Sequence, residues 1–334
     1  SSFGYFEQEG IMLGTGYKRG DVRLNTDHKV SDRVTIGQNL YGAFDERLVE
    51  QQSGGRTQLQ HMLRSAPYFP IYNPDAFGGY WGAQAADGSD PENPVRIAMM
   101  DKQNQQRLKL LGNVYADIKL FDFLTYRFKA GIDYVDYTQR GHLPAYSTGG
   151  YSNRAAAQIN QNRQHFASVL LTNQLTFDKT FGKHALNAIV VAEQQTNNFS
   201  QISGQGENGV SNDIKEPVGL SSIGFSGNKS ESALISYIGR VNYEFDGKYL
   251  IGASLRRDGS SRFAEGKRWG TFPAVSAGWR ISEEPFMAGA DFISDLKLRG
   301  SYGITGNNTS GDYGAISTIT GNQIYWFGGA AVTG

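Results

Sequence analysis

The sequence predicts an all-β fold, an antiparallel transmembrane β-barrel segment of about ten strands. Three observations support this fold class. Apolar and polar residues alternate with period two along many segments, short connections between these segments alternate with long ones, and aromatic residues gather where the segments end. Unbroken apolar runs are far shorter than the ~18 residues of a membrane helix, whereas a β-barrel crosses a bilayer without one.

The composition excludes several other classes. The 334 residues include 42 glycines, 12% aromatic residues, 19% charged residues and no cysteine. Few charges with many glycines argue against a helical bundle, and the aromatic content argues against disorder. Without cysteine there is no disulfide framework and no thiolate metal site. Because 32 basic residues balance 32 acidic ones, no net charge attracts nucleic acid.

The clearest strand lies over residues 107–120. Its even-numbered positions, from Leu108 to Leu120, are all apolar or glycine, and its odd-numbered positions are mostly polar. Such a segment is amphipathic as a strand and not as a helix. The same test predicts the other strands, over 22–29, 34–44, 126–134, 166–177, 185–197, 233–245, 249–257, 272–281 and 296–306.

Connection lengths alternate along the chain. Short connections are expected at 30–33, 121–124, 178–184, 246–248 and 282–295, and long ones at 45–106, 138–164, 199–231, 259–271 and after 307. In an antiparallel sheet this alternation gathers the long connections at one end, as in transmembrane barrels. Aromatic residues at the strand ends are expected to form girdles at the two headgroup layers: Tyr41, Phe44, Phe121, Phe123, Phe177, Phe181, Tyr243, Phe245, Tyr249 and Phe272.

In lipid, a sheet of ten strands must either close into a barrel by itself or be completed by further strands, because the open edges of a sheet expose unpaired backbone groups. Residues 3–6 resemble the tail of a further strand, and the last residues lie in a long connection. We therefore expect more strands outside residues 1–334 to complete the barrel.

Three stretches carry a specific resemblance to a known family. They read SLRRDGSSRF (254–263), RWGTFPAVSAGWRISEEPFM (268–287) and LKLRGSYGITGN (296–307). These residues strongly resemble the SusC/RagA family of TonB-dependent outer membrane transporters. Weaker matches extend the resemblance over nearly the whole chain, at 23–25, 93–95, 131–133 and 236–243.

The resemblance implies a 22-stranded barrel with a plugged lumen in the outer membrane of a Gram-negative bacterium. It also implies import of glycans, oligosaccharides or peptides, a TonB complex that supplies energy, and a SusD-like surface lipoprotein as partner. Residues 1–334 are then part of the barrel, and the plug, the TonB box and the closing C-terminal strands are expected elsewhere.

Two groups of residues are candidates for the site. Exposed aromatic residues in long connections can stack on sugars or anchor a partner, although loop packing explains them equally well: Tyr80, Trp81, Tyr325 and Trp326. Charged residues on polar strand faces are expected to line a water-filled interior, with mutual pairing across strands as the alternative: Arg127, Lys129, Asp133, Arg240, Arg256, Asp258, Arg280, Lys297 and Arg299.

Other motifs favour structural interpretations. Gly204-x-Gly206-x-x-Gly209 follows no strand and is expected to be a flexible loop. Oxygen ligands between Asp87 and Asn93 lack the spacing of an EF-hand, and the five histidines show no paired-ligand spacing, so no metal or cofactor is assigned. The run Ser282-Glu283-Glu284-Pro285 predicts a short helix N-terminus, not an acid–base pair.

Three alternatives remain open from the residues. A passive porin shares the barrel and lacks a plug. An outer-membrane enzyme needs a serine or acid–base constellation, and the sequence offers none. A soluble β-sandwich adhesin should turn its apolar faces toward an internal core.

Overall fold

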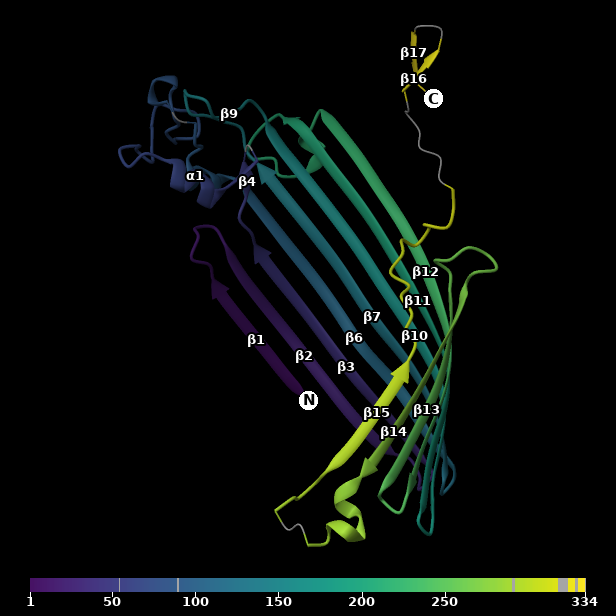
Figure 1. The fold of residues 1–334 in the computed structure, drawn as a ribbon. Helices are drawn as coiled ribbons and strands as arrows, with labels where there is room; N and C mark the ends of the chain where they lie inside the picture. Colours follow the sequence, from purple (N-terminus) through teal and green to yellow (C-terminus); the bar gives the residue numbers. More distant parts are fainter. Residues whose placement is uncertain (54, 89, 290–291, 318–323, 328–329, 334) are drawn as a thin grey trace. The chain divides into compact units, whose positions relative to one another are not determined.

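The computed structural model contains an 11-stranded sheet in the order β1-β2-β3-β6-β7-β10-β11-β12-β13-β14-β15 (Figure 1). Every neighbour is therefore the next long strand along the chain. The structure describes residues 1–53, 55–88, 90–289, 292–317, 324–327 and 330–333.

The bounds of the elements follow in chain order. The strands of the main sheet are β1 (Ser2–Glu9), β2 (Gly16–Lys29), β3 (Val34–Leu48), β6 (Lys102–Phe121), β7 (Leu124–Leu143), β10 (Ala157–Phe181), β11 (His184–Gly209), β12 (Ser222–Phe245), β13 (Tyr249–Ser260), β14 (Trp269–Arg280) and β15 (Lys297–Gly303). Short strand pairs are β4 (Gln52–Ser53) with β5 (Arg56–Thr57), β8 (Tyr146–Ser147) with β9 (Asn153–Arg154), and β16 (Ile324–Phe327) with β17 (Ala330–Thr333). Helices are α1 (Gln58–Arg64) and α2 (Pro94–Met100), with 3-10 turns η1 (Ala85–Asp87), η2 (Pro217–Gly219), η3 (Ile281–Glu283) and η4 (Pro285–Met287).

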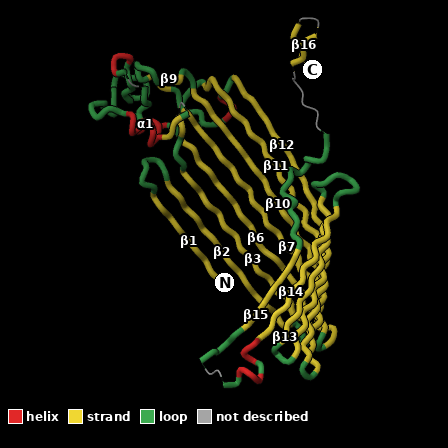
Figure 2. The backbone as a smooth tube through the Cα atoms, viewed as in Figure 1, coloured by secondary structure: helices red, strands yellow, loops and turns green. Residues whose placement is uncertain are grey.

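The chain divides into two compact units. One comprises Ser1–Asp117, Lys129–Leu170 and Asn197–Ser230, and the other comprises Ile118–Phe128, Leu171–Thr196 and Glu231–Gly334. The first unit contains the helices α1 and α2, both in the connection between β3 and β6. Figure 2 shows α1 in red. The second unit contains the paired segments of β12, β13, β14 and β15, which form an antiparallel ladder.

All ten predicted strands are present, and β1 supplies the eleventh where the sequence showed a strand tail. Most strands extend further than the alternation indicated, most clearly β10 and β11, whereas β15 is shorter than the predicted 296–306. Their outer ends carry polar residues on both faces, so no period-two signal marks them. The connection between β10 and β11 shrinks accordingly to two residues, whereas the one between β12 and β13 has the three residues expected, 246–248.

The expectation of a flexible loop at the glycine motif was wrong. Gly204, Gly206 and Gly209 all lie within β11. A side chain at Gly204 would meet the ring of Phe225, and one at Gly206 would meet Leu220. These glycines therefore leave room for neighbouring side chains and do not form a nucleotide-binding turn.

The apolar faces of the strands are exposed and do not form a core. Along β13 every odd-numbered position from Tyr249 to Arg257 is exposed, and every even-numbered position is half-buried. Leu255, Ile251 and Val275 are more than half exposed. The buried hydrophobic residues are few and mostly small: Ala43, Ala83, Ile97, Ala98, Ala145, Tyr146, Ala157 and Ile159. This arrangement is the opposite of a β-sandwich, whose apolar faces pack together.

Most of this small core lies in a lobe of the first unit, formed by residues 55–101 and 144–154 without residue 89. Thr57 begins α1 with a capping box that includes Gln60, and the Asn93 side chain accepts hydrogen bonds from the backbone of Val95 and Arg96 at the start of α2. Among the described residues, no helix combines the length and apolar composition needed to cross a membrane.

Two of the expected girdle residues lie on the polar face. Phe272 pairs with Arg256 in the β13–β14 ladder and lines a cavity beside it, and Tyr41 pairs with Arg23, whose guanidinium carbon lies 5.5 Å from the Tyr41 ring centroid. Sequence position near a strand end does not reveal the face, because a shift of one residue exchanges the two faces. Around the short connections the aromatic residues do gather, as Phe121, Phe123 and Phe177 show.

Candidate functional site

The polar faces of β12 to β15 bring charged residues from four strands together. Even-numbered residues of β12, β13 and β14 share this face with odd-numbered residues of β15, because Arg240 pairs with Ser254, Ser254 with Ala274, and Ala274 with Gly303. Two cavities lie on this face, both within the second unit.

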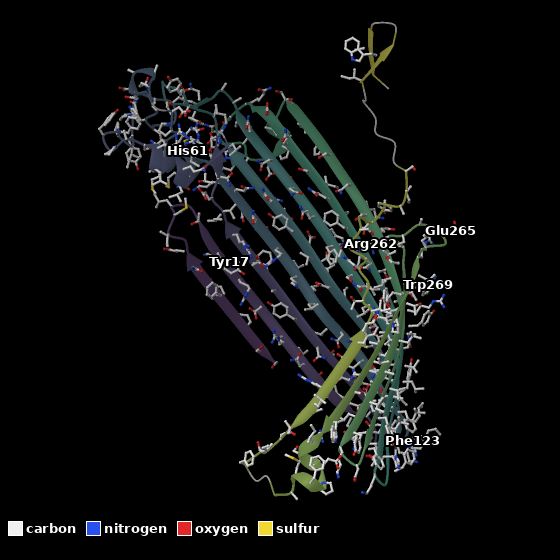
Figure 3. All side chains as sticks on the ribbon, viewed as in Figure 1. Tyr17, His61, Phe123, Arg262, Glu265 and Trp269 are labelled. Carbon is white, nitrogen blue, oxygen red and sulfur yellow. The ribbon has the colours of Figure 1, made fainter. Side chains whose placement is uncertain are left out.

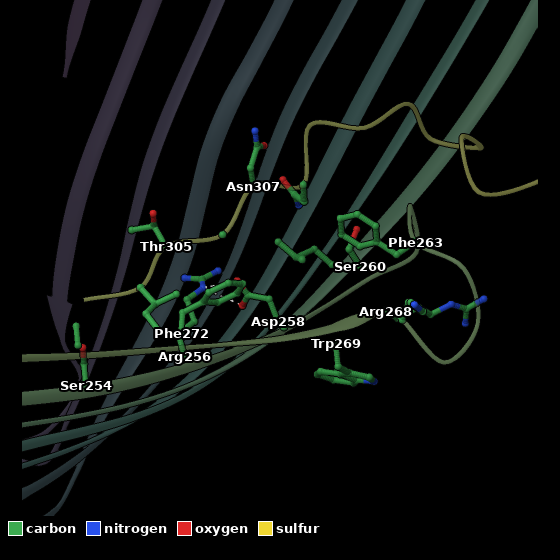
Figure 4. Close-up of a pocket in the computed structure, with 17 residues that line it drawn as sticks. Ser254, Arg256, Asp258, Ser260, Phe263, Arg268, Trp269, Phe272, Thr305 and Asn307 are labelled. Carbon is green, nitrogen blue, oxygen red and sulfur yellow. Dashed lines mark hydrogen bonds and ion pairs between the residues drawn. The ribbon is translucent and has the colours of Figure 1, made fainter. Parts of the chain in front are cut away.

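The first cavity has a volume of about 690 Å³ and is shown in Figure 4. Arg256 lies on its floor, with Nε 2.7 Å from Asp258 Oδ2, and donates a 3.0 Å hydrogen bond to the buried Ser236 hydroxyl. Phe272 and Phe263 supply apolar surface, and Thr305 and Asn307 supply polar groups. A charged pair beside aromatic rings and amides suits a polar organic ligand with an apolar face.

The chain after β15 folds back against this cavity. Arg262, which lies in the connection between β13 and β14 and is labelled in Figure 3, holds this segment with Nε 2.8 Å from Asp312 Oδ1 and donates a 3.0 Å hydrogen bond to the Asn308 carbonyl. The Tyr313 hydroxyl accepts a 3.0 Å hydrogen bond from the Glu231 backbone. A side chain at Gly306 would collide with the Phe272 ring, so glycine permits this close approach.

The second cavity has a volume of about 880 Å³, and its lining carries charges of both signs, with Asp178 and Glu244 among them. Arg240, Lys297 and Arg299 face it, above a floor of small residues that includes Gly252 and Ser276. Within the described residues none of these three cations makes an ion pair, and Arg240 makes one long hydrogen bond, 3.4 Å to Asn242.

The predicted lumen residues therefore separate into distinct places. Arg256 and Asp258 form an ion pair within β13, not the pairing across strands that was the alternative, whereas Arg240 and Arg299 line the second cavity and form no ion pair among the described residues. Arg127, Lys129 and Asp133 lie in β7. Asp133 Oδ1 is buried and has no hydrogen-bond partner among the described atoms.

The predicted ligand-contacting aromatics have different surroundings. Trp81 packs against Phe69 with ring centroids 4.3 Å apart, and its carbonyl accepts a hydrogen bond from Asn93. The Tyr80 and Tyr72 rings lie with centroids 5.6 Å apart and are tilted by 37°, and burial raises the pKa of the Tyr80 phenol. Trp326 is 76% exposed on β16, and the Tyr325 side chain lies outside the described residues.

Exposed aromatic residues that sequence reasoning missed lie in the same lobe. Tyr68, Tyr72 and Phe77 are all more than 60% exposed. The dense run from Tyr68 to Tyr72, with Pro70 inside it, was the available signal, because proline and aromatic residues together suit a rigid exposed loop.

A buried arginine organises this lobe. Arg96 is fully buried, with Nη2 2.7 Å from Glu92 and Nη1 3.1 Å from Asp101. Its guanidinium carbon lies 3.9 Å from the Tyr146 ring centroid, and Arg154 approaches Asp101 at 2.8 Å. Burial raises the pKa of Tyr146 to about 12.

The oxygen-rich run from Asp87 to Asn93 is used internally. Asp90 binds Arg56 and Arg64, and the hydrogen bond from Arg56 lowers the pKa of Asp90. Glu92 binds Arg96, and Asn93 caps α2. The side-chain oxygens of Asp90, Glu92 and Asn93 are therefore used in ion pairs and in a helix cap within the lobe.

The turn after β14 differs from the predicted helix start. Two 3-10 turns, η3 and η4, replace a helix, and Pro285 begins the second of them. Ser282 makes no cap and instead contacts Asp295 at 3.3 Å. Glu284 accepts hydrogen bonds from Tyr249 and Trp279, which together with Lys248 lower its pKa.

These features can be compared with known proteins. The family model described as TonB dependent receptor-like, beta-barrel matches residues 12–330. The chain belongs to this family. Its exposed apolar faces and polar inner faces are those of a transmembrane barrel wall.

Curated relatives agree with this assignment. TonB-dependent receptor P39 of Formosa agariphila is 29% identical over 96% of this chain and 30% of its own length. TonB-dependent receptor SusC of Bacteroides thetaiotaomicron is 27% identical over 93% of this chain and 32% of its own length. The chain thus spans about a third of the length of the relatives that it matches.

Solved structures show the same fold. The structure of the RagAB peptide transporter matches with a TM-score of 0.80 at 23% identity, over 99% of this chain and 37% of that chain. The RagAB peptide importer in its open-open state matches with a TM-score of 0.74 at 22% identity, over 97% of this chain and 36% of that chain.

Proposed function

We propose that this chain is the barrel portion of a SusC-like transporter in the outer membrane of a Gram-negative bacterium. The transporter imports oligosaccharides or peptides with energy delivered through TonB, in partnership with a SusD-like surface lipoprotein. The observation that carries the proposal is that the strands have two different faces. One face is apolar and exposed, and the other carries charged residues and two cavities, and the chain belongs to a family of TonB-dependent receptors.

The two substrate classes have separate support. One relative is named SusC, and the matched solved structures are titled as a peptide transporter and importer. Exposed rings such as Tyr72 and Trp326 suit the faces of sugars, whereas the charges of both signs in the second cavity suit the charged ends of peptides. We propose that Tyr80, Trp81, Tyr325 and Trp326 contribute ligand contacts, and that the charged residues of β7 and β12 to β15 line the water-filled interior.

Uptake by cells carrying the complete receptor tests this function. Fluorescent oligosaccharides and oligopeptides are offered to cells with and without the receptor, and a protonophore is then added to remove the energy source of TonB. We expect receptor-dependent uptake of one class that stops with the protonophore. Uptake that continues with the protonophore would instead identify a passive porin, and recovery of the receptor in the soluble fraction would contradict the proposal.

A further inference from the structure

The first cavity holds an arginine whose orientation is fixed by two neighbours. Arg256 donates from Nε to both carboxylate oxygens of Asp258, at 2.8 and 2.7 Å, and from Nη2 to the Ser236 hydroxyl at 3.0 Å. Ser236 itself is only 1% exposed. Among the described residues the remaining nitrogen, Nη1, has no hydrogen-bond partner. Arg256 therefore offers a positioned, charged donor to a molecule in the cavity.

The other free polar groups of this cavity are mainly donors. Asp258 is the one carboxylate among the described residues that line it, and both of its oxygens already accept from Arg256. The Asn307 side-chain oxygen accepts a 2.9 Å hydrogen bond from the Thr309 backbone. Within the described part of the chain, the Asn307 amide nitrogen and the Thr305 hydroxyl have no partner. A ligand that complements this lining must bring acceptor oxygens.

The charge around the cavity also favours an anion. Lys267 and Arg268 belong to its lining and are exposed, and neither makes an ion pair with a described residue. Glu265, in the same connection, does not line the cavity. In Figure 4 Arg268 extends away from Arg256, so Arg256 is the cation that a ligand meets inside.

Apolar surface lies next to these donors. Figure 4 shows the Phe272 ring beside Arg256, and Phe263 is a further lining residue. Gly306 lets the segment after β15 pass close to the Phe272 ring, and this segment brings Thr305 and Asn307 to the cavity. The volume of about 690 Å³ lies within the range of small-molecule sites.

The cavity lies at the end of the sheet that carries the longer connections. Ser260 ends β13, Trp269 begins β14, and both line the cavity. The connection 261–268 between them is longer than the connection 246–248 at the other end of β13. Longer connections are extracellular in transmembrane barrels. In the proposed transporter, the cavity is therefore on the side from which a ligand arrives.

We propose that the first cavity binds a carboxylate-bearing ligand. The carboxylate accepts hydrogen bonds from Arg256 Nη1, Asn307 and Thr305, and the adjoining apolar group packs against Phe272 and Phe263. A guanidinium matches the geometry of a carboxylate, and charge-assisted hydrogen bonds are the stronger ones. Such a carboxylate is supplied by the C-terminus of an oligopeptide or by the uronate of an acidic oligosaccharide. This inference rests on the proposed function and adds the charge of the ligand that is selected.

Isothermal titration calorimetry of the purified complete receptor in detergent tests the site. One probe is an N-acetylated tripeptide ending in phenylalanine, as the free acid and as the C-terminal amide. The other is a trigalacturonate, as the acid and as its methyl ester. We expect the acid form of one probe to bind at least about tenfold more tightly than its neutral form, because hydrogen bonds to charged groups contribute more than neutral ones. This comparison needs no variant, so misfolding of a variant leaves the proposal testable.

Two variants connect the preference for the acid to the cavity. Arg256→Gln should weaken binding of the acid form about tenfold and remove the preference. Asn307→Asp keeps the oxygen that accepts from Thr309 but adds a negative charge, so it should weaken binding of the acid form and not of the neutral form. Arg257→Gln is the matched control, because Arg257 is the next residue of β13 and lies on the opposite face. It should leave the affinity for both forms unchanged.

Equal affinity for the acid and neutral forms of both probes would overturn the proposal. The same holds for the absence of measurable binding by either acid, and for a preference that survives in Arg256→Gln. The probe that shows the preference identifies the source of the carboxylate. Calorimetry needs no TonB complex, so a receptor that binds the acid without energy-dependent uptake would contradict the proposed transport and leave the site standing.

Discussion

At the scale of single residues, the surroundings of each charge decide what it does. Arg96 and Arg64 both bind carboxylates in the same lobe, but Arg96 is fully buried and Arg64 is half-exposed. Water screens the exposed pair and leaves it a small net contribution, whereas a buried carboxylate that loses its partner remains unsolvated. Sequence alone does not separate these cases, since both are arginines near aspartates.

Arg96→Ala should destabilise the lobe strongly. The substitution removes the guanidinium that pairs with Asp101 and Glu92 and contacts the Tyr146 ring. We expect the free energy of unfolding to fall by about 3 kcal/mol. Limited proteolysis of the complete receptor would detect earlier cleavage within residues 55–101. Arg64→Ala is the control, expected to cost less than about 1 kcal/mol. Equal protease resistance of both variants would show that Arg154 alone satisfies Asp101.

At the scale of elements, glycine positions decide how closely strands and rings approach. Gly37 in β3 lies beneath the Tyr115 ring, and the Tyr115 hydroxyl hydrogen-bonds to Asp27 on the next strand. Gly259 beneath Trp269 repeats the arrangement on the other face. Part of the high glycine content therefore provides room for aromatic side chains that lie flat on the sheet.

Gly37→Val should destabilise β2, β3 and β6 together. Its side chain would collide with Tyr115 and Asp27, and overpacking of this kind costs about 1–3 kcal/mol. Urea unfolding of the complete receptor in lipid vesicles measures the change. Gly20→Val is the matched control in β2, because open space surrounds that position, and it should change stability little. Similar losses in both variants would indicate a general cost of replacing strand glycines.

The turn between β14 and β15 should respond to acid through Glu284. Its pKa is lowered by hydrogen bonds from Tyr249 and Trp279 and by Lys248. A carboxyl group whose pKa is lowered in the folded state stabilises the fold when the pH is above the ordinary pKa of that group. This stabilisation is lost as the pH falls through the pKa of the folded state. The fluorescence of Trp279 should therefore change below about pH 4.

Glu284→Gln isolates this group. The amide keeps a hydrogen-bonding oxygen but does not titrate, so the difference between the fluorescence titrations of the two proteins reports Glu284. Identical titration curves for the receptor and the variant would assign the acid response to other carboxylates.

At the scale of the whole molecule, the two faces of the wall meet different surroundings. Val275 and Ser276 are adjacent in β14 and both exposed, and they point to opposite faces. Val275 pairs with Ala253, midway along the apolar band, and Ser276 lines the second cavity. In a membrane barrel the first position contacts lipid and the second contacts water or the contents of the lumen.

Val275→Arg should therefore destabilise the receptor much more than Ser276→Arg. An arginine facing lipid at the bilayer midplane costs about 2–4 kcal/mol, whereas substitutions facing the lumen avoid this cost. Unfolding of the complete receptor in vesicles measures both. If Val275→Arg proved harmless, this face would contact water and the membrane assignment would fail.

The sequence by itself determined the fold class and all ten predicted strands, because period-two alternation depends only on local residue chemistry, and the stretches at 254–263, 268–287 and 296–307 indicated the family by resemblance. It could not determine the face of Phe272 or Tyr41, the extension of β11 through Gly209, or the partners of the charged residues. Those depend on register between strands, and a shift of one residue reverses every face. Only the tertiary structure placed Arg256 beside Asp258, laid the Arg257 guanidinium over the Trp269 ring, and gathered Arg240 and Arg299 around one cavity.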